Sequence, residues 1–554
     1  MHNDRLMRTV RAKLRVWNGI ALGAVLLLSV GVVSGVLDRP KTDAETVVAT
    51  FVDALNSGDV DTAASVTSYP AAAKATMSQM FDALDPEHVE YDVNQVIDLG
   101  DGSGMFNAAA SWDLGDGRHW DYNVNGWVRQ LSIGWRVSWN PQTLAPGLGN
   151  GRILRLDRTD AAAPRVFDLV GTPLMTEQRI NAVNLDPATI TDPVRTTDML
   201  AKAIEPVAPL ITAESMRQDL AKANGQQVTA VSLRDADFEI LEPDLRAVPG
   251  VVIVQRPKLI TVDRRISTPL TDSLKNVWQA NRDETAGWAV NAVDPDGTVT
   301  QLTGYQGPPG PDIRASLDSR LQLAAEDAVV SVGTPAAIVA LQPSSGAVIA
   351  AAQNNQASDL GPIAFNGLFP SGSAIDLVRT AASAQNSDLE HTARQLGLGL
   401  DVDIPGLDQR TAAFPGGGPK LMRAATDGRA DDEVRVSPLG MALVASSIAR
   451  GTPTIPVISS GRPPVANQGA APLPPAVTEQ LRTIMRDTVQ RGDASQLKGY
   501  GDLIGATGAS GQDRWFYGTK GDLAFAVYVQ DADGGDQAVK MTDRMFTALA
   551  KPPA

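Results

Sequence analysis

The C-terminal part of the sequence contains Ala336-Ala-Ile-Val-Ala-Leu-Gln-Pro-Ser-Ser-Gly-Ala-Val-Ile-Ala-Ala351. Two apolar runs lie on either side of Pro343-Ser-Ser-Gly346, which predicts a strand, a turn and a second strand. The apolar stripe from Leu317 to Ala328 predicts a helix before them. Alternating apolar residues from Leu523 to Val529 predict a further strand, and the last residues predict a closing helix. This order favours an α/β sandwich over residues 312–554.

The preceding region, residues 151–311, carries scattered prolines and no long hydrophobic period. Such a pattern predicts an irregular second domain. Val251-Val-Ile-Val254 predicts one short buried strand within it. The glycine- and proline-rich run from Gly304 to Pro311 predicts a linker to the C-terminal domain.

Residues 41–150 predict a small α+β domain in which helices come first and an antiparallel sheet follows. Thr42 can cap a helix whose apolar residues fall on one face as far as Leu55. Apolar and polar residues alternate from Leu131 to Trp139, which predicts a half-buried strand. Many of the nine tryptophans lie in this region. A packed core explains them better than a ligand platform.

An uncharged apolar run over residues 16–37 follows a cluster of arginines and lysines at the N-terminus. As a helix it would span roughly 33 Å, about one bilayer core. The positive-inside rule then predicts a cytoplasmic tail over residues 1–15, a single-pass anchor in the cell membrane and extracytoplasmic C-terminal domains. A cleaved signal peptide is the alternative.

Composition excludes several classes of function. The 554-residue chain has no cysteine, which rules out disulfides, iron–sulfur clusters and a cysteine nucleophile. Its four scattered histidines argue against a histidine metal site and a Ser-His-Asp triad. The net charge of −15 disfavours nucleic-acid binding. We therefore predict no cofactor and no metal, and the acidic run from Asp427 to Glu433 fits a solvated loop better than a calcium site.

Five segments of the C-terminal region stand in a characteristic order: Ile313-Arg-Ala-Ser-Leu-Asp318, Val339-Ala-Leu-Gln-Pro-Ser-Ser-Gly-Ala-Val-Ile-Ala350, Gly367-Leu-Phe-Pro-Ser-Gly-Ser373, Val436-Ser-Pro-Leu-Gly-Met-Ala442 and Gly505-Ala-Thr-Gly-Ala-Ser510. Together they resemble the transpeptidase domain of penicillin-binding proteins, which has a β-lactamase-like α/β fold.

Two upstream segments extend this resemblance. The sequence from Trp135 to Leu148 is similar to the end of the NTF2-like N-terminal domain in the MecA-type, class B branch of that family. The sequence from Arg165 to Leu174 lies at the position where the dimerisation or pedestal domain begins in that family. The resemblance implies an NTF2-like domain over residues 41–150, a pedestal over 151–311 and a transpeptidase-like domain over 312–554.

The family's active site uses the motifs S-x-x-K, S-D-N and K-T-G. The first reads Ser373-Ala-Ile-Asp376 here and the third reads Ala506-Thr507-Gly508, so both lysines are absent. Asp376 is a weak base, because the reference pKa of aspartate is near 3.9. The stretch expected to carry the middle motif is missing, and Ser383-Ala-Gln-Asn386 matches it only with the wrong spacing.

Each of these residues also has a plain structural interpretation. Ser373 can be a helix N-cap, and Asp376 can interact favourably with a helix dipole. Thr507 and Gly508 can be a strand residue and a glycine at a close approach. Arg514 and Lys520 can supply a replacement cation, but an exposed hairpin explains them better. Arg379 lies six residues after Ser373, on the opposite face of the predicted helix, and is not expected to replace the lysine.

We interpret the chain as a membrane-anchored pseudo-transpeptidase of peptidoglycan synthesis or cell division that acts through partners. Those partners would be cell-wall synthesis or division proteins, with a peptidoglycan stem peptide or a β-lactam as a further ligand. The alternative is an active serine D,D-transpeptidase or carboxypeptidase that binds penicillin through Ser373. It requires a cation or an unusual base about 2.6–3.2 Å from the Ser373 hydroxyl. The non-catalytic hypothesis instead predicts an exposed apolar patch on the N-terminal or second domain.

Overall fold

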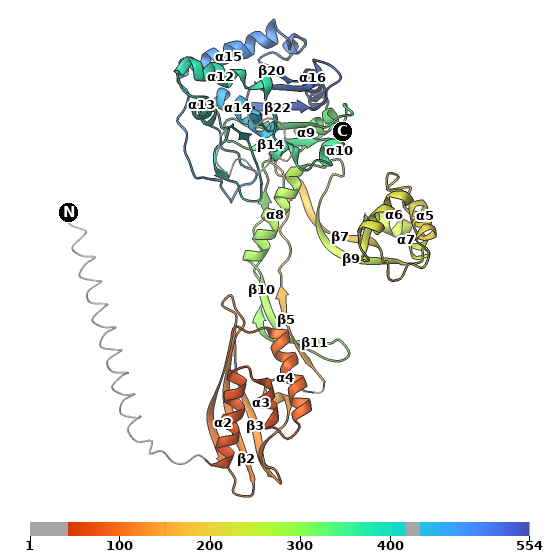
Figure 1. Ribbon diagram of the computed structural model, residues 1–554, viewed down its shortest axis with the longest axis vertical. Coiled ribbons are helices and arrows are strands. Elements are labelled where there is room, and N and C mark those ends of the chain that lie inside the picture. Colours follow the sequence, from red (N-terminus) through yellow and green to blue (C-terminus); the bar gives the residue numbers. More distant parts are fainter. Residues whose placement is uncertain (1–41, 150, 416–432, 553–554) are drawn as a thin grey trace, which may run out of the picture. The chain divides into compact units, whose positions relative to one another are not determined.

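The computed structural model describes residues 42–149, 151–415 and 433–552. The chain forms two compact units: the N-terminal unit extends to Thr159 and includes Ala286–Gly307, and the C-terminal unit comprises Asp160–Thr285 and the residues from Pro308 onward (Figure 1). The predicted tail and anchor, residues 1–15 and 16–37, lie outside the described residues. Within the described ranges, no helix has both the length and the apolar character needed to cross a membrane.

Three helices open the N-terminal unit: α2 Asp43–Asn56, α3 Val60–Ser65 and α4 Pro70–Leu84. Thr42 begins α2 with a reciprocal cap. Its hydroxyl accepts a hydrogen bond from the Glu45 backbone N–H at 3.2 Å, and the Glu45 carboxylate accepts one from the Thr42 N–H at 2.7 Å. The apolar stripe of α2 is buried as far as Leu55. The helix predicted at this position is therefore confirmed.

These helices cover one face of an antiparallel sheet with the order β1-β2-β3-β4, formed by β1 His88–Asp98, β2 Ser103–Asp113, β3 His119–Leu131 and β4 Gly134–Ser138. Trp112 and Trp120 belong to the core, as predicted, but the prediction is wrong for Trp127, which is exposed because it points to the face of the sheet opposite the helices. The single strand predicted from Leu131 to Trp139 is wrong in part, because a turn divides it. Gly134 has a φ of +103°, which favours glycine at this turn, and alternation in the sequence does not reveal that conformation.

A second sheet of the N-terminal unit has the order β11-β10-β5, from β5 Ile153–Thr159, β10 Gly287–Val293 and β11 Val299–Tyr305. Leu154, Val290 and Ala292 join the core beneath the first sheet. This corrects the predicted domain over residues 151–311, because residues 151–159 and 286–307 belong to the N-terminal unit. The physical reason is the pairing of β5 with β10, which are far apart in the sequence.

The stretch between β5 and β10 is regular, so the prediction of an irregular domain is also wrong. Its strands β7 Pro173–Leu185 and β9 Val251–Thr261 form a long antiparallel ribbon. Strand β8 Val228–Arg234 pairs with β7, and the helices α5 Pro193–Ile204, α6 Ala213–Lys222 and α7 Asp235–Arg246 share one core with these strands. Some of the prolines that suggested irregularity instead begin helices, as Pro193 does in α5.

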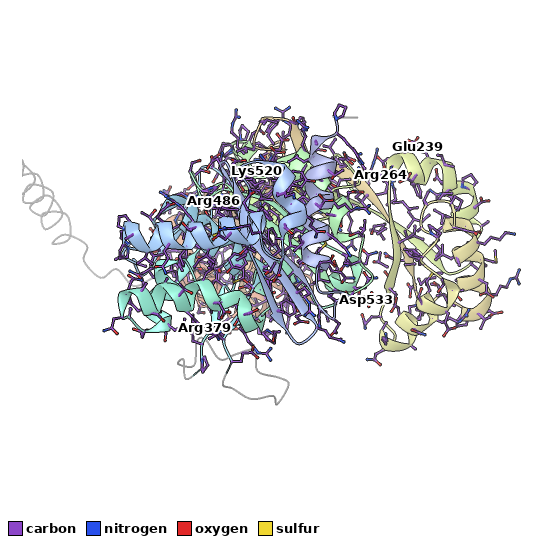
Figure 2. The ribbon with its side chains drawn as sticks, turned by 90° about the horizontal axis from the view of Figure 1, so that it is seen from above. Glu239, Arg264, Arg379, Arg486, Lys520 and Asp533 are labelled. Carbon is purple, nitrogen blue, oxygen red and sulfur yellow. The ribbon has the colours of Figure 1, made fainter. Side chains whose placement is uncertain are left out.

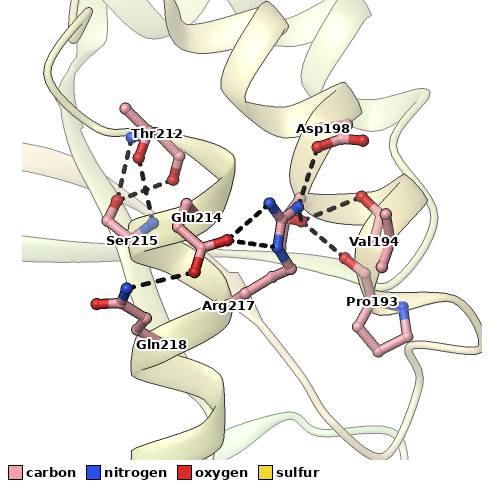
Figure 3. A network of polar contacts seen from close by, with 9 residues as sticks. Pro193, Val194, Asp198, Thr212, Glu214, Ser215, Arg217 and Gln218 are labelled. Carbon is pink, nitrogen blue, oxygen red and sulfur yellow. Dashed lines mark hydrogen bonds and ion pairs between the residues drawn. The ribbon is translucent and has the colours of Figure 1, made fainter.

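Arg217 of α6 joins this helix to α5 (Figure 3). Its guanidinium donates to the Glu214 carboxylate within α6 at 3.0 Å and to the Asp198 carboxylate of α5 at 3.1 Å. Thr212 and Ser215 cap the start of α6 reciprocally. These bonds fix the two helices beside each other with polar contacts that are largely exposed.

Arg282 of α8 Pro269–Glu284 links this helix to β7 and to the segment that follows β5. Its guanidinium bonds to the carboxylates of Glu177 at 2.9 Å and Asp160 at 2.7 Å. The same group lies 4.6 Å from the centroid of the Trp278 ring. The side chain is only 20% exposed, so screening by water weakens these charges less than at an open surface.

We expect Arg282→Met to lower the free energy of unfolding of the C-terminal unit by about 2 kcal/mol, because two carboxylates would lose their shared cation. Chemical denaturation of the full chain would measure this. Arg246→Met is the matched control, since Arg246 is exposed and pairs with Glu242 on the surface of α7. Equal, small effects of both substitutions would contradict the role given to Arg282.

The C-terminal part of the second unit is the predicted α/β sandwich. Its five-stranded sheet has the order β14-β13-β22-β21-β20, from β13 Ala336–Leu341, β14 Val348–Gln353, β20 Ile504–Ser510, β21 Asp513–Lys520 and β22 Leu523–Val529. Helices α9 Ser319–Val329 and α16 Gln537–Ala550 pack on one face, and α14 Pro438–Arg450 packs on the other. The hairpin predicted from residues 336–351 is confirmed by β13 and β14.

Candidate functional site

Ser373 lies on a sharp turn that is pressed against β20. The short strand β15 Phe369–Pro370 leads into this turn, and α12 Asp376–Gln385 follows it. Gly372 has a φ of +47°, and a Cβ atom there would lie 2.0 Å from the carbonyl oxygen of Ala509. The turn therefore requires glycine at position 372, because its φ is positive and because a larger side chain would collide with Ala509.

Gly508 allows β20 to approach the other side of this turn. A Cβ atom on Gly508 would lie 2.5 Å from Cα of Ala374, and Tyr517 donates a hydrogen bond to the Ala374 carbonyl at 2.8 Å. The interpretation of Gly508 as a glycine at a close approach is confirmed. The structure thus brings the first and third motif positions together, with Ala506 buried and Thr507 half-buried on the same strand.

The Ser373 hydroxyl is exposed and bonds to the backbone of Ala509. Its Oγ accepts a hydrogen bond from the Ala509 N–H at 3.0 Å and lies 3.5 Å from the Ala509 carbonyl oxygen. Neither the 3₁₀ turn Gly372–Ile375 nor α12 begins with a side-chain cap. The interpretation of Ser373 as a helix N-cap is therefore wrong, because its hydroxyl points to β20 instead.

Asp376, at the position of the first motif lysine, forms an ion pair. Its Oδ1 accepts a hydrogen bond from Arg379 Nη1 at 2.8 Å, and the same nitrogen donates to the Gly372 carbonyl at 3.3 Å. Arg379 was predicted on the helix face opposite Ser373, yet its long side chain folds back to the turn. A guanidinium cannot accept a proton, so this cation does not replace a basic lysine.

The described residues supply no evident base for Ser373. The hydrogen bonds found for its hydroxyl within these ranges both involve Ala509. Tyr517 is a buried phenol bonded to the Ser373 turn, and burial, with the negative charge of Asp376 as a smaller cause, raises its pKa far above the ordinary value. Tyr517 therefore keeps its proton at neutral pH, and its hydroxyl donates a hydrogen bond to the Ala374 carbonyl.

The other candidate cations are occupied elsewhere. Lys520 bonds to Asp502 at 3.0 Å. It lies at the end of the β20–β21 hairpin remote from Ala509, since Ile504 pairs with Thr519 and Ala509 pairs with Arg514. Figure 2 shows Lys520 well separated from Arg379. Arg514 donates to the carbonyls of Gly511 and Asp513 at 2.7 and 2.8 Å.

The superficial match to the middle motif lies away from Ser373. Asn386 caps the C-terminal end of α12 in a left-handed conformation. The helix between it and Ser373 is about 15 Å long at 1.5 Å per residue. Helix α13 Leu389–Gln395 follows directly. The structure therefore does not bring Ser383 and Asn386 to the nucleophile position.

Glu433 is a polar residue of this site that the sequence did not reveal. Its Oε1 accepts hydrogen bonds from the Gly372 N–H at 3.2 Å and from the Ser510 hydroxyl at 3.4 Å. The sequence placed it in an acidic run, and the other acids of that run, Asp427, Asp431 and Asp432, lie outside the described residues. No periodicity or motif marks Glu433 as a partner of the Ser373 turn.

The turn that carries Ser373 thus holds two carboxylates, Asp376 and Glu433, with Arg379 as the cation bonded to this turn in the described residues. No group of three or more histidine, aspartate or glutamate side chains in the described ranges is arranged to hold a metal ion. The arrangement holds a serine hydroxyl on backbone groups, but it does not show the basic partner that nucleophilic catalysis needs.

Comparison with known families addresses the N-terminal unit. Residues 43–152 match the model of the NTF2-like N-terminal transpeptidase domain, MecA_N. This match confirms the predicted NTF2-like type of the domain. The match supports a MecA-type family similar to penicillin-binding proteins. No curated protein matches the chain.

Proposed function

We propose that this chain is a membrane-anchored protein of peptidoglycan synthesis or cell division, similar to penicillin-binding proteins, whose transpeptidase-like domain does not form an acyl-enzyme. It would act through partners among the cell-wall synthesis or division proteins. The NTF2-like domain at residues 43–152 supports the family setting, because its model describes transpeptidases.

The proposal that this domain does not form an acyl-enzyme rests on the surroundings of the Ser373 hydroxyl. Ser373 contacts only backbone groups of Ala509 among its described hydrogen bonds. Asp376 and Ala506 stand where the family places its two lysines. A serine without a neighbouring base loses most of its reactivity, because nucleophile and base act as a unit.

Two further features favour the same conclusion. The Ala509 N–H is the kind of backbone donor that stabilises a developing oxyanion in acyl transfer, and here it is bonded to Ser373 itself. Among the described residues, Asp376 and Glu433 also place two negative charges at the turn, and Arg379 is the cation bonded to it. A stem peptide or β-lactam carries a carboxylate, which this field would repel.

Incubating the full chain, solubilised in detergent, with a labelled penicillin is expected to give no covalent adduct by intact-mass spectrometry. A penicillin-binding protein of known reactivity in a parallel reaction establishes that the label is competent. Circular dichroism of the same sample establishes that the chain is folded. An unmodified, folded chain is the expected result.

Two variants make the result decisive. Ser373→Ala removes the nucleophile position, and Ser383→Ala removes an exposed serine of α12 outside the site. An adduct on the wild type and on Ser383→Ala, but not on Ser373→Ala, would overturn the proposal. It would instead establish the active D,D-transpeptidase or carboxypeptidase with a rebuilt site.

A further inference from the structure

The outer face of the NTF2-like sheet, opposite its helices, carries a row of exposed apolar side chains. Ile97 pairs with Met105, and Met105 pairs with Trp127 on the next strand. These three side chains therefore lie side by side across β1, β2 and β3. Their exposed fractions are 38%, 37% and 46%, respectively.

The row continues onto the two turns at the same end of the sheet. Leu99 follows β1, and Leu131 and Ile133 lie at the turn between β3 and β4. They are 50%, 40% and 69% exposed. We call these six side chains the turn-end surface: Ile97, Leu99, Met105, Trp127, Leu131 and Ile133. Single exposed apolar residues are ordinary, but a contiguous group marks a surface that contacts something else.

The opposite end of the same outer face is polar and acidic. A shallow pocket there is lined by residues that include Glu90, Asp92, Ser111, Asp121 and Asn123. Near the turn-end surface, Arg129 and Arg136 are paired across β3 and β4. Asp98 and Asp101 are the acids of the β1–β2 turn, and their carboxylates accept hydrogen bonds from Gly100 and Ser103 within that turn. Net charge is therefore small at the apolar end and negative at the other.

The turn-end surface lies at the end of the domain where the chain enters. Asn56, at the C-terminal end of α2, bonds to the backbone of Tyr91 near the start of β1. Phe51 contacts Phe106, which pairs with Val96 near the end of β1. Helix α2 thus lies along the sheet with its first residues toward the β1–β2 turn (Figure 1). Only residues 38–42 separate α2 from the apolar run 16–37, and they span at most about 18 Å.

We propose that the turn-end surface rests on the outer leaflet of the cell membrane, so that a lipid surface is its partner. This proposal depends on the membrane anchor of the proposed function. A short connection keeps the turns within reach of the head groups. Tryptophan is favoured at the membrane interface, leucine and isoleucine can enter the acyl boundary, and arginines can extend to lipid phosphates. The acidic end of the sheet then points away from the negatively charged lipids.

The absence of cysteine in the chain allows a single probe to be placed on this surface. Ile133→Cys, labelled with an environment-sensitive fluorophore, would be reconstituted as the full chain in phosphatidylcholine–phosphatidylglycerol vesicles with or without brominated acyl chains. We expect a blue-shifted emission that the brominated lipids quench. Asn123→Cys, on the same face of β3 but at the polar end, is the matched control and should show neither effect.

A second variant links the signal to the surface. Trp127→Gln with Leu131→Gln in the Ile133→Cys chain should reduce the quenching, and both sites are exposed, so folding should survive. If the probe at position 133 shows the emission of an aqueous environment while the chain floats with the vesicles, this inference is overturned but the membrane anchor is not. A blue shift without quenching by bromine indicates a second copy or another protein and also overturns it. A chain that does not float with the vesicles overturns the anchor and this inference together.

Discussion

Gly508→Ala is expected to lower the free energy of unfolding of the C-terminal unit by about 3 kcal/mol, at the upper end for overpacking a well-packed interior. The new Cβ atom would lie 2.5 Å from Cα and 2.7 Å from N of Ala374. These are backbone atoms, so no side-chain rotation relieves the collision. Either β20 moves away from the turn or the turn itself is displaced. Denaturant midpoints of the two full-length proteins would measure the effect.

Gly499→Ala is the matched control for this prediction. It adds the same methyl group in the same unit, but nothing lies within 4 Å of its Cβ position. We expect it to leave the midpoint nearly unchanged. A loss as small for Gly508→Ala as for Gly499→Ala would show that β20 does not depend on its contact with Ala374.

Glu326 is expected to make the stability of the C-terminal unit fall as the pH rises. Burial raises the pKa of its carboxyl from 4.5 to about 7, against the opposing effect of hydrogen bonds from Gln322 and from the Ser267 N–H. Between these two values the folded chain holds a proton that the unfolded chain has released. The stabilisation that this proton gives to the folded chain is therefore fully present below about pH 4.5. It is lost as the pH rises through 7, which lowers the free energy of unfolding by up to about 3 kcal/mol.

Glu326→Gln tests this directly, because glutamine keeps the acceptor oxygen and the shape but does not ionise. We expect the variant to be more stable than the wild type at pH 8 and to have similar stability at pH 4.5. Glu239→Gln, which changes an exposed carboxyl of α7, should retain the wild-type pH dependence. A parallel pH profile for wild type and Glu326→Gln would contradict the buried carboxyl as the cause.

Local patterns in the sequence predicted the elements whose signals are complete within a short window. The hairpin from Ala336 to Ala351 has two apolar runs and a turn, and the structure confirms it. Helix α2 has a cap and a regular stripe. Where an element is defined by its pairing with a segment distant in the sequence, the local pattern did not predict it. The pairing of β5 with β10 leaves no signal in either segment, so the sequence predicts one irregular domain over residues 151–311.

The candidate site shows the same limit. The resemblance to penicillin-binding proteins pointed to Ser373, Asp376 and Gly508. The bond from Ala509 to Ser373 and the contact of Glu433 with the turn join residues that are distant in the sequence. Arg379 was misplaced for another reason, because helical periodicity gives the direction of Cβ and not the reach of a long side chain.

The interruption of the N-terminal unit by a long insertion has a consequence for biosynthesis. Thr159 pairs with Gly287, and Leu154 pairs with Ala292. At roughly 5–20 residues per second, a ribosome makes the stretch between these partners in on the order of ten seconds. During that interval β5 has no neighbour in its sheet, and the apolar residues it contributes to the core stay without their partners on β10. A nascent chain stalled before residue 287 should therefore be sensitive to proteases at β5, whereas one extended past residue 307 should not.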